Sequence, residues 1–148
     1  MIPETTQGFE MRPATLDDVP MIAADLLPEG IDDFRRAGFN PVLTMAIDVL
    51  SDESYVVISP DNKPCALLGI GKDGCMWMNM TNEIRRHPKA FIKCAKSWMN
   101  SLPHKLVWNA VDIQNTQLLK FLRLLGCQFL GVYPVGAKNT LYIEFVKL

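Results

Sequence analysis

The chain has 148 residues, of which 49% are hydrophobic and 21% charged; this composition excludes a disordered protein and provides the core of one domain. We therefore expect residues 1–148 to form a single domain, with a polar tail over residues 1–8. Fifteen basic and sixteen acidic residues give a formal net charge of -1, so overall charge draws the protein neither to nucleic acid nor to anionic membranes.

The cysteines and the apolar runs narrow the class further. Four cysteines without a CxxC pair, together with only two histidines, argue against a zinc site. Because the start of the chain lacks the pattern of a signal peptide, we expect reduced thiols and an intracellular protein, with two disulfides as the alternative. No apolar run reaches the roughly 20 residues that a membrane span needs, so we predict a soluble protein.

The first part of the chain predicts one strand and three helices. Residues 9–12 form the strand, and Thr15 with Asp18 resembles a capping box that starts a helix reaching residue 27. A second helical stretch ends at Gly38 and a third begins at Pro41, because glycine ends helices and proline fits their first turn. In the third helix, three apolar residues share one face at helical spacing: Leu43, Ile47 and Leu50.

The central part of the chain predicts three consecutive antiparallel strands. Residues 54–59 and 65–70 form a hairpin, and residues 75–81 form the third strand. A core face is the common use of a row of methionines, and the lining of a pocket is the alternative. Alternation along the third strand places such a row on one face: Met76, Met78 and Met80.

The last part predicts a helix, a strand, a helix and two strands. Pro88 fits the first position of a helix, and residues 106–111 form the following strand. Asn115 caps a leucine-rich helix, and the closing strands cover residues 129–133 and 141–146. The apolar face of the first of these helices repeats at helical spacing: Phe91, Ile92, Ala95, Trp98 and Met99.

This order of elements predicts an α/β fold. A single mixed sheet with helices on both faces is the simplest arrangement that buries every apolar stripe. The order resembles that of the GNAT acetyltransferase fold. Residues 11–20, which read MRPATLDDVP, are similar to its first strand and helix, and residues 111–129 are similar to its late strand, helix and terminal glycine. The resemblance implies one GNAT-like domain.

A second resemblance is closer and covers most of the chain. Residues 29–38 form an acidic, glycine-ended helical segment that precedes the hairpin. This segment resembles one in the small GNAT-like internal virion proteins of short-tailed podophages. The strand of Trp77, the helix of Trp98, and residues 107–111 with Asn115 also resemble that family. The resemblance implies a protein found in virions, and in the host cytoplasm during assembly.

The GNAT resemblance implies acetyl-CoA as cofactor and two requirements for acetyl transfer. The first is a glycine-rich loop at a helix N-terminus, where main-chain N–H groups hold the diphosphate. The corresponding residues 81–88, TNEIRRHP, contain no glycine, and Pro88 has no N–H to donate. The second is a tyrosine four residues before the terminal glycine, which protonates the departing thiolate. Leu122 occupies that position and donates no proton, so we predict no catalytic residue.

A few residues keep a cofactor site open. Arg85 and Arg86 would bind a phosphate through their side chains, although exposed charges that only solubilise a loop are commoner. Asn115 matches the asparagine that precedes this helix in the family and contacts the cofactor there, although an N-cap explains the residue completely. His87 and His104 are isolated, and surface positions explain them better than a role as general base.

These observations favour a non-catalytic structural or assembly protein of a phage virion, which uses a degenerate GNAT fold to contact other virion proteins. The first alternative is an N-acetyltransferase that uses acetyl-CoA with an atypical cofactor loop formed by Arg85, Arg86 and Asn115. The second is a phage protein that binds and modulates a host protein. We expect no metal, no nucleic acid and no membrane as partner in any of the three cases.

Overall fold

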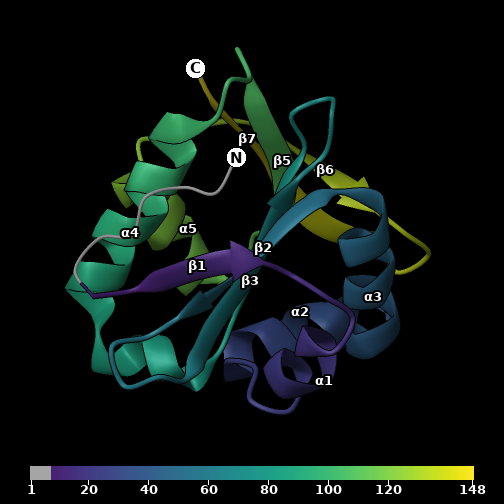
Figure 1. The fold of residues 1–148 in the computed structure, drawn as a ribbon. Helices are drawn as coiled ribbons and strands as arrows, with labels where there is room; N and C mark the ends of the chain where they lie inside the picture. The colour runs from purple at the N-terminus through teal and green to yellow at the C-terminus, as the bar shows by residue number, and fades with distance from the viewer. Residues whose placement is uncertain (1–7) are drawn as a thin grey trace.

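The computed structural model describes residues 8–148, so the predicted polar tail lies outside the described residues except for Gly8. The helices and strands follow one another in the predicted order (Figure 1). Their bounds are β1 (Glu10–Pro13), α1 (Asp18–Ala23), α2 (Pro28–Ala37), α3 (Pro41–Ser51), β2 (Glu53–Ile58), β3 (Pro64–Ile70), β4 (Met76–Met80), the 3-10 helix η1 (Asn82–Arg86), α4 (Pro88–Ser101), β5 (Val107–Asp112), α5 (Thr116–Leu124), β6 (Gln128–Val135) and β7 (Thr140–Lys147). None of these helices is long and apolar enough to cross a membrane.

The strands form two antiparallel sheets. One has the order β1-β2-β3-β4 and the other the order β5-β7-β6. A single parallel bridge between Cys75 and Trp108 joins them. The predicted mixed α and β class is confirmed, but the predicted single mixed sheet is wrong: two antiparallel sheets are joined by one parallel bridge, because β4 and β5 pair only there. The two sheets therefore separate on one side of the bridge.

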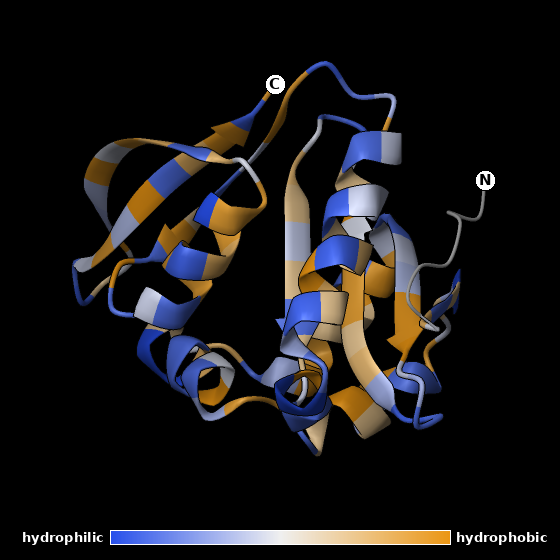
Figure 2. Ribbon diagram, turned by 90° about the vertical axis from the view of Figure 1, so that its left-hand side faces the viewer, coloured by the Kyte–Doolittle hydropathy of each residue, from blue (hydrophilic) through white to orange (hydrophobic). Residues whose placement is uncertain are grey.

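Helices cover both faces of the four-stranded sheet, because successive side chains of a strand point to opposite faces. Tyr55 and Val57 of β2 lie in one core cluster with α4 and α5, while Val56 lies in a second cluster with α1 and α3. Figure 1 shows the same division, with α4 and α5 on one side of the central strands and α1, α2 and α3 on the other. Figure 2 shows apolar residues gathered on these central strands.

The predicted face of α3 is found on the surface instead of in the core. Leu43, Ile47 and Leu50 are 61%, 53% and 72% exposed. The helix is apolar around much of its circumference, and its buried contacts are made by Met45, which is fully buried, with Val49 packed against the same cluster. Periodicity alone does not decide which of two apolar stripes faces the sheet.

The predicted capping pair has a further role at the start of α1. Asp18 accepts hydrogen bonds from the main-chain N–H of Thr15 at 2.8 Å and from Arg12 at 2.7 and 3.0 Å. Burial raises the pKa of Asp18, but the hydrogen bonds from Arg12 and Thr15 outweigh it and hold the pKa below its usual value. The buried carboxylate therefore ties β1 to α1 through a two-point ion pair.

Candidate functional site

A groove of about 760 Å³ lies between β4 and β5. Residues of α4 and α5 form its floor and residues of α2 line its other side. Most of the lining is apolar, as in pockets for small molecules, which commonly have volumes of about 300–1,000 Å³. The groove is therefore the candidate functional site of this chain.

The groove exists because β4 and β5 diverge directly after the bridge. At the bridge, the main-chain N–H of Trp108 donates to the carbonyl of Gly74 at 3.0 Å. The side chain of Asn109 makes the next connection, because it donates to the carbonyl of Met76 at 2.6 Å and accepts from the N–H of Ala110 at 2.7 Å. Past Asn109 the described strands have no further pairing, and the groove opens.

Gly74 permits the close approach of the two sheets at the bridge. Its φ is +90°, and a Cβ atom there would lie 2.2 Å from the carbonyl oxygen of Leu106. Only glycine adopts this φ at no steric cost, and it alone leaves room for that carbonyl. The position of the groove mouth therefore depends on this residue.

The GNAT resemblance places a diphosphate at residues 81–88. In this segment, main-chain groups are bonded to other groups of the same chain. Five main-chain N–H groups of residues 81–87 donate hydrogen bonds within the protein. Thr81 donates to Cys65, Asn82 to Asp25, Glu83 to the Thr81 hydroxyl, Ile84 to the Thr81 carbonyl and His87 to Ile84, at 2.9–3.3 Å. This segment, which has no glycine, thus forms the 3-10 helix η1 instead of a glycine-rich phosphate-binding loop.

Two carboxylates also lie at the start of α4. Glu83 is buried and accepts a hydrogen bond from the Ser59 hydroxyl at 2.6 Å. The Nε2 atom of His87 lies 2.8 Å from Asp61 and 3.7 Å from Glu83. The hydrogen bond from His87, together with the nearby Arg86, holds the pKa of Asp61 below its usual value. Each carboxylate therefore has a partner within the chain.

The same cluster has the residue types of a cation site. The candidate ligand atoms of Asp61, Glu83 and His87 all lie within 4.8 Å of one another. However, the guanidinium of Arg86 lies 3.4 Å from the Asp61 carboxylate, and this positive charge opposes a metal ion. The three candidate ligands already have partners within the chain: Glu83 bonds to Ser59, and Asp61 pairs with Arg86 and His87.

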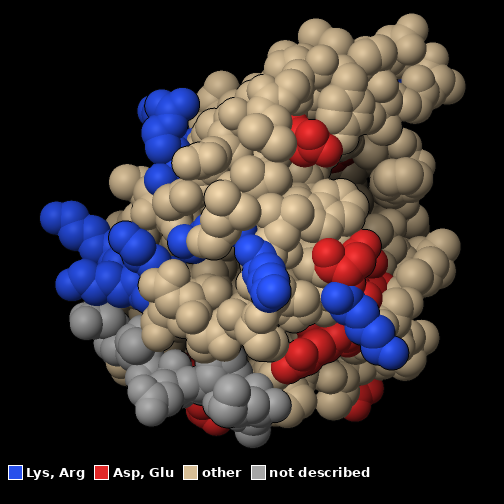
Figure 3. Space-filling view, turned by 90° about the horizontal axis from the view of Figure 1, so that it is seen from above, with Lys and Arg blue, Asp and Glu red and all other residues tan. Residues whose placement is uncertain are grey.

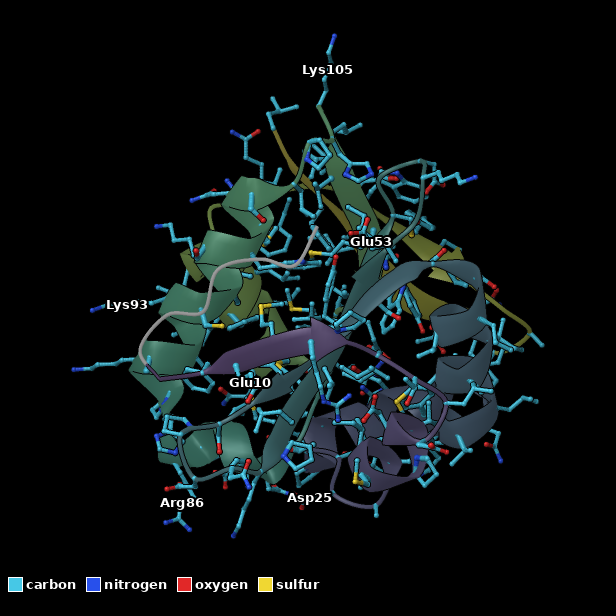
Figure 4. The ribbon with its side chains drawn as sticks, in the orientation of Figure 1. Glu10, Asp25, Glu53, Arg86, Lys93 and Lys105 are labelled. Carbon is cyan, nitrogen blue, oxygen red and sulfur yellow. The ribbon has the colours of Figure 1, made fainter. Side chains whose placement is uncertain are left out.

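The structure does not bring the three predicted cofactor residues together. Arg85 and Asn115 line the groove, whereas Arg86 is absent from its lining. The Arg85 guanidinium lies 3.4 Å from Glu29, and Figure 4 shows Arg86 pointing outward from the fold. Both arginines are more than half exposed, as expected for charges that solubilise a loop.

Asn115 is the N-cap of α5, as predicted. Its Oδ1 atom accepts from the main-chain N–H of Leu118 at 3.1 Å. Its Nδ2 group donates to Asp33 of α2 at 2.6 Å. Asn115 is buried, and both ends of its amide are occupied by the chain itself.

A partly buried ion-pair network holds α2 against β5 and α5. Arg36 lies 2.5 Å from Asp112 and 2.8 Å from Asp33, and the Asp112 side chain is 1% exposed. Burial raises the pKa of Asp33 to about 6, although hydrogen bonds from Asn115 and Arg36 oppose the increase. Sequence reasoning missed this network. The spacing of Asp33 and Arg36 on a helix is a local signal for a pair, but their partners are distant in sequence.

The tyrosines add one residue that sequence reasoning also missed. Leu122, at the position of the family's tyrosine, is buried in the core. Of the three tyrosines, only Tyr142 of β7 lines the groove, and it lies opposite Asp112 in the strand register. Burial and the charges of Asp112 and Asp33 raise the pKa of Tyr142. The raised pKa therefore favours the protonated phenol at neutral pH.

Comparison with known proteins establishes the fold alone. No family model and no curated protein sequence matches this chain. A GCN5-related N-acetyltransferase from Brucella melitensis superimposes with a TM-score of 0.71 at 17% identity, over 100% of this chain and 78% of its own. One from Kribbella flavida gives a TM-score of 0.65 at 14% identity, over 95% and 98% of the two chains. A GNAT-family acetyltransferase from Streptococcus agalactiae gives 0.67 at 12%, over 97% and 97%. The chain therefore has the GNAT fold predicted from its sequence.

Proposed function

We propose that this chain is a non-catalytic protein that uses the GNAT fold to bind other proteins. The observation that carries the proposal is the internally bonded segment over residues 81–88. Five of its main-chain N–H groups donate hydrogen bonds within the chain, and the carboxylates of Asp61 and Glu83 lie close to the His87 side chain. A diphosphate requires free N–H donors and positive potential. The residues at this helix end do not fit the diphosphate of coenzyme A.

The proton donor of acetyl transfer also has no counterpart at its usual position. Leu122 is 2% exposed and packs in the core. A positioned acid contributes at least about a hundredfold to such a reaction. Tyr142 of β7 lines the groove. Because its pKa is raised, its phenol is a weaker acid than an ordinary tyrosine and gives up its proton less readily. Efficient acetyl transfer has little support from these residues.

Exposed apolar surface supports a role in protein contacts. Leu43, Ile47 and Leu50 form an exposed row along α3, and contiguous apolar surface is typical of interaction sites.

Lysines 89, 93 and 96 lie on the outer side of α4, where Figure 3 shows positive side chains gathered at one edge of the molecule; Lys93 points away from the sheet (Figure 4). An ordinary solvent-exposed helix face accounts for these lysines.

The resemblance to internal virion proteins of short-tailed podophages supports a phage particle as the place of this binding. The partners are then other virion proteins, and the location is the virion and, during assembly, the host cytoplasm. Mass spectrometry of purified particles and of assembly intermediates tests this assignment, and we expect the chain in at least one of them. Its absence from both contradicts the assignment. Capture of a host protein from lysate, without particle association, instead supports a protein that modulates a host factor.

An N-acetyltransferase is the second candidate, because the solved structures with this fold are acetyltransferases by description and the groove is large enough for a cofactor arm. Arg85 and Asn115 would then line the cofactor site. A thermal unfolding titration with acetyl-CoA separates the candidates, since a ligand at about 100 times its Kd stabilises the native state by about 2.7 kcal/mol. We expect no increase in Tm at millimolar acetyl-CoA. A saturable increase favours the enzyme.

A further inference from the structure

The outer side of α3 carries a continuous row of apolar side chains. Residues that share one side of a helix recur every three or four positions, and alternating steps of three and four are the spacing of a helix-pairing seam. The seam here consists of Leu43, Ala46 and Leu50, with Val42 and Ile47 beside them. In Figure 1, α3 lies at the outer edge of the molecule. The row therefore faces solvent in the single chain.

The row is large enough for the centre of a dimer interface. The large side chains Val42, Leu43, Ile47 and Leu50 are 47–72% exposed, and Phe39, two positions before α3, is 63% exposed. At about 150–200 Å² for a fully exposed large side chain, these residues present roughly 500 Å² of apolar surface. A standard interface buries about 800 Å² per partner, and about 65% of this area is apolar in homodimers. The apolar surface therefore matches what a stable dimer needs.

The row carries no charge. Asp48 is the one charged residue of α3, and it lies two positions from Ala46, which is about 200° around the helix. Charges begin at the end of the row, where Arg36 and Lys138 line a hollow of about 250 Å³ beside Phe39. A surface that meets its own copy brings like charges together, which weakens association. An uncharged row with charges only at its rim avoids this cost.

The order of large and small side chains along the row fits a second copy of itself. A two-fold axis between residues 46 and 47 of two antiparallel α3 helices brings Leu43 opposite Leu50 of the second copy. The same axis brings Ala46 opposite Ile47, so a small side chain meets a large one. Each contact occurs twice in such an interface. The space beside Ala46 thus accepts Ile47 as a hole accepts a knob.

We propose that two copies of this chain associate through antiparallel α3 helices, with residues 43–50 at the centre of the interface. Phe39 and Val135, which line the same hollow, lie at its rim. The inference goes beyond the proposed function, because it assigns the row to a second copy of the chain. It stands on residues outside the groove, and it holds for a chain with or without partners in a virion.

Sedimentation velocity of the full chain, from micromolar to millimolar concentration, measures this association. We expect the mass of a dimer at the upper end of the range. Leu50→Glu places a charge against Leu43 of the second copy. Because a two-fold interface contains each substitution twice, we expect the Kd of the dimer to increase about a hundredfold or more. Circular dichroism verifies that the variant is folded.

Leu124→Glu is the matched control. Leu124 is 57% exposed and belongs to α5, which lies on the other side of the central strands from α3 (Figure 1). We expect this variant to dimerise within about twofold of the native chain, because distant sites act independently. An equal loss of association in the two variants overturns the assignment to α3.

Two further variants test the antiparallel pairing itself. Leu43→Lys combined with Leu50→Glu places opposite charges face to face, and should recover about tenfold or more of the affinity that Leu50→Glu loses. Ala46→Leu adds apolar area but fills the space for Ile47, so it should weaken the dimer about tenfold. A surface that is merely adhesive would associate more tightly in Ala46→Leu. That result, or a failure of the double variant to recover affinity, overturns the antiparallel pairing.

The oligomeric state and the particle assay fail separately. A native chain that stays monomeric at millimolar concentration overturns the inference. If this monomer is found in purified particles and Leu50→Glu is not, the row binds another virion protein instead of a second copy. A dimer that is absent from particles and assembly intermediates leaves the inference standing and contradicts the proposed location.

Discussion

In the four-stranded sheet, β3 is buried along nearly its whole length, whereas in the three-stranded sheet all but one residue of β6 are exposed. The first sheet lies between helices on both faces and carries both core clusters. The second contributes few residues to them, among them Phe145 of β7, which is fully buried. The bridge at Cys75 and the Asn109 side chain join the two sheets, and the ion pair of Arg36 with Asp112 ties α2 to β5.

This difference separates the part of the fold that provides stability from the part that forms the site. Packing of apolar side chains fixes the first sheet, because interiors leave little freedom for rearrangement. The Asn109 side chain connects the two sheets, and the ion pair of Arg36 with Asp112 holds α2 against β5 beside that junction. The groove lies along that junction, where a small number of hydrogen bonds decide how far β4 and β5 are apart.

Matched leucine truncations in the two sheets provide the largest expected contrast. Leu68→Ala in β3 removes a side chain that is 1% exposed, and we expect a loss of about 2–5 kcal/mol in the free energy of unfolding. Leu130→Ala in β6 removes one that is 54% exposed, and we expect a change below about 0.5 kcal/mol. Urea denaturation measures both. Equal losses would contradict the division between a packed and an exposed sheet.

The ion pair between α2 and β5 tests the junction. Arg36→Gln leaves Asp112 buried without its cation, and we expect a loss of about 2–3 kcal/mol, because removal of one partner from a buried pair is costly. The neighbour Arg35 pairs with Asp32 on the surface and is 71% exposed, so Arg35→Gln should cost below about 0.5 kcal/mol. Urea denaturation compares the two variants.

The second substitution Asp112→Asn sharpens this test. In the Arg36→Gln background it removes the unpaired charge, and we expect part of the lost stability to return. Hydrogen exchange in α2 should increase in Arg36→Gln and not in Arg35→Gln. Equal exchange in the two variants would mean that Asp112 does not hold α2 in place.

The element order was predictable because its signals are local. Proline at the first position of α4 and Asn115 at the start of α5 mark helix starts without reference to the rest of the chain. The exposed face of α3 was not predictable in the same way, since Leu43 and Met45 are equally apolar and only the packed sheet decides between them. The close approach of the two sheets at the bridge depends on Gly74, whose role is visible only beside the carbonyl of Leu106.

Two residues of the groove lining, Arg85 and Asn115, were predicted from the sequence, whereas the contacts between distant parts of the chain were not. The missing glycines of residues 81–88 were legible in the sequence. The network that uses Asn115 was not, because its partner Asp33 lies 82 positions away. The same holds for Arg36 and Asp112, which are 76 positions apart. Such pairs follow from the placement of α2 against β5, for which the chain has no local pattern.

Gly74 tests the bridge between the sheets. Gly74→Ala combines an unfavourable φ of +90° with a Cβ atom 2.2 Å from the carbonyl oxygen of Leu106, so we expect a loss of about 1–3 kcal/mol. Gly136→Ala meets a φ of +77° with no neighbour within 4 Å, and should lose about 1 kcal/mol from strain alone. Thermal unfolding compares them. If Gly136→Ala is the more damaging, the close approach at the bridge does not matter.

The smallest effect concerns the pH dependence of the junction. Burial raises the pKa of Asp33 to about 6, above the value of about 3.9 in an unfolded chain. The folded state therefore binds this proton more tightly, and the free energy of unfolding should increase by about 1 kcal/mol as the pH falls from about 7 to about 5. Asp48, whose pKa burial also raises to about 6, contributes with the same sign.

Asp33→Asn separates the two carboxylates. Urea denaturation at several pH values should show a smaller increase in this variant than in the native chain, because the contribution of Asp33 is lost while that of Asp48 remains. Asp48→Asn is the matched control, since Asp48 lies on α3 outside the junction. An unchanged pH dependence in Asp33→Asn would show that its carboxylate is solvated, and that α2 covers the junction less closely than the hydrogen bond to Asn115 indicates. A reduced pH dependence in both variants assigns part of the effect to each carboxylate. The difference between the two reductions then compares how strongly Asp33, at the junction, and Asp48, on α3, are shielded from water.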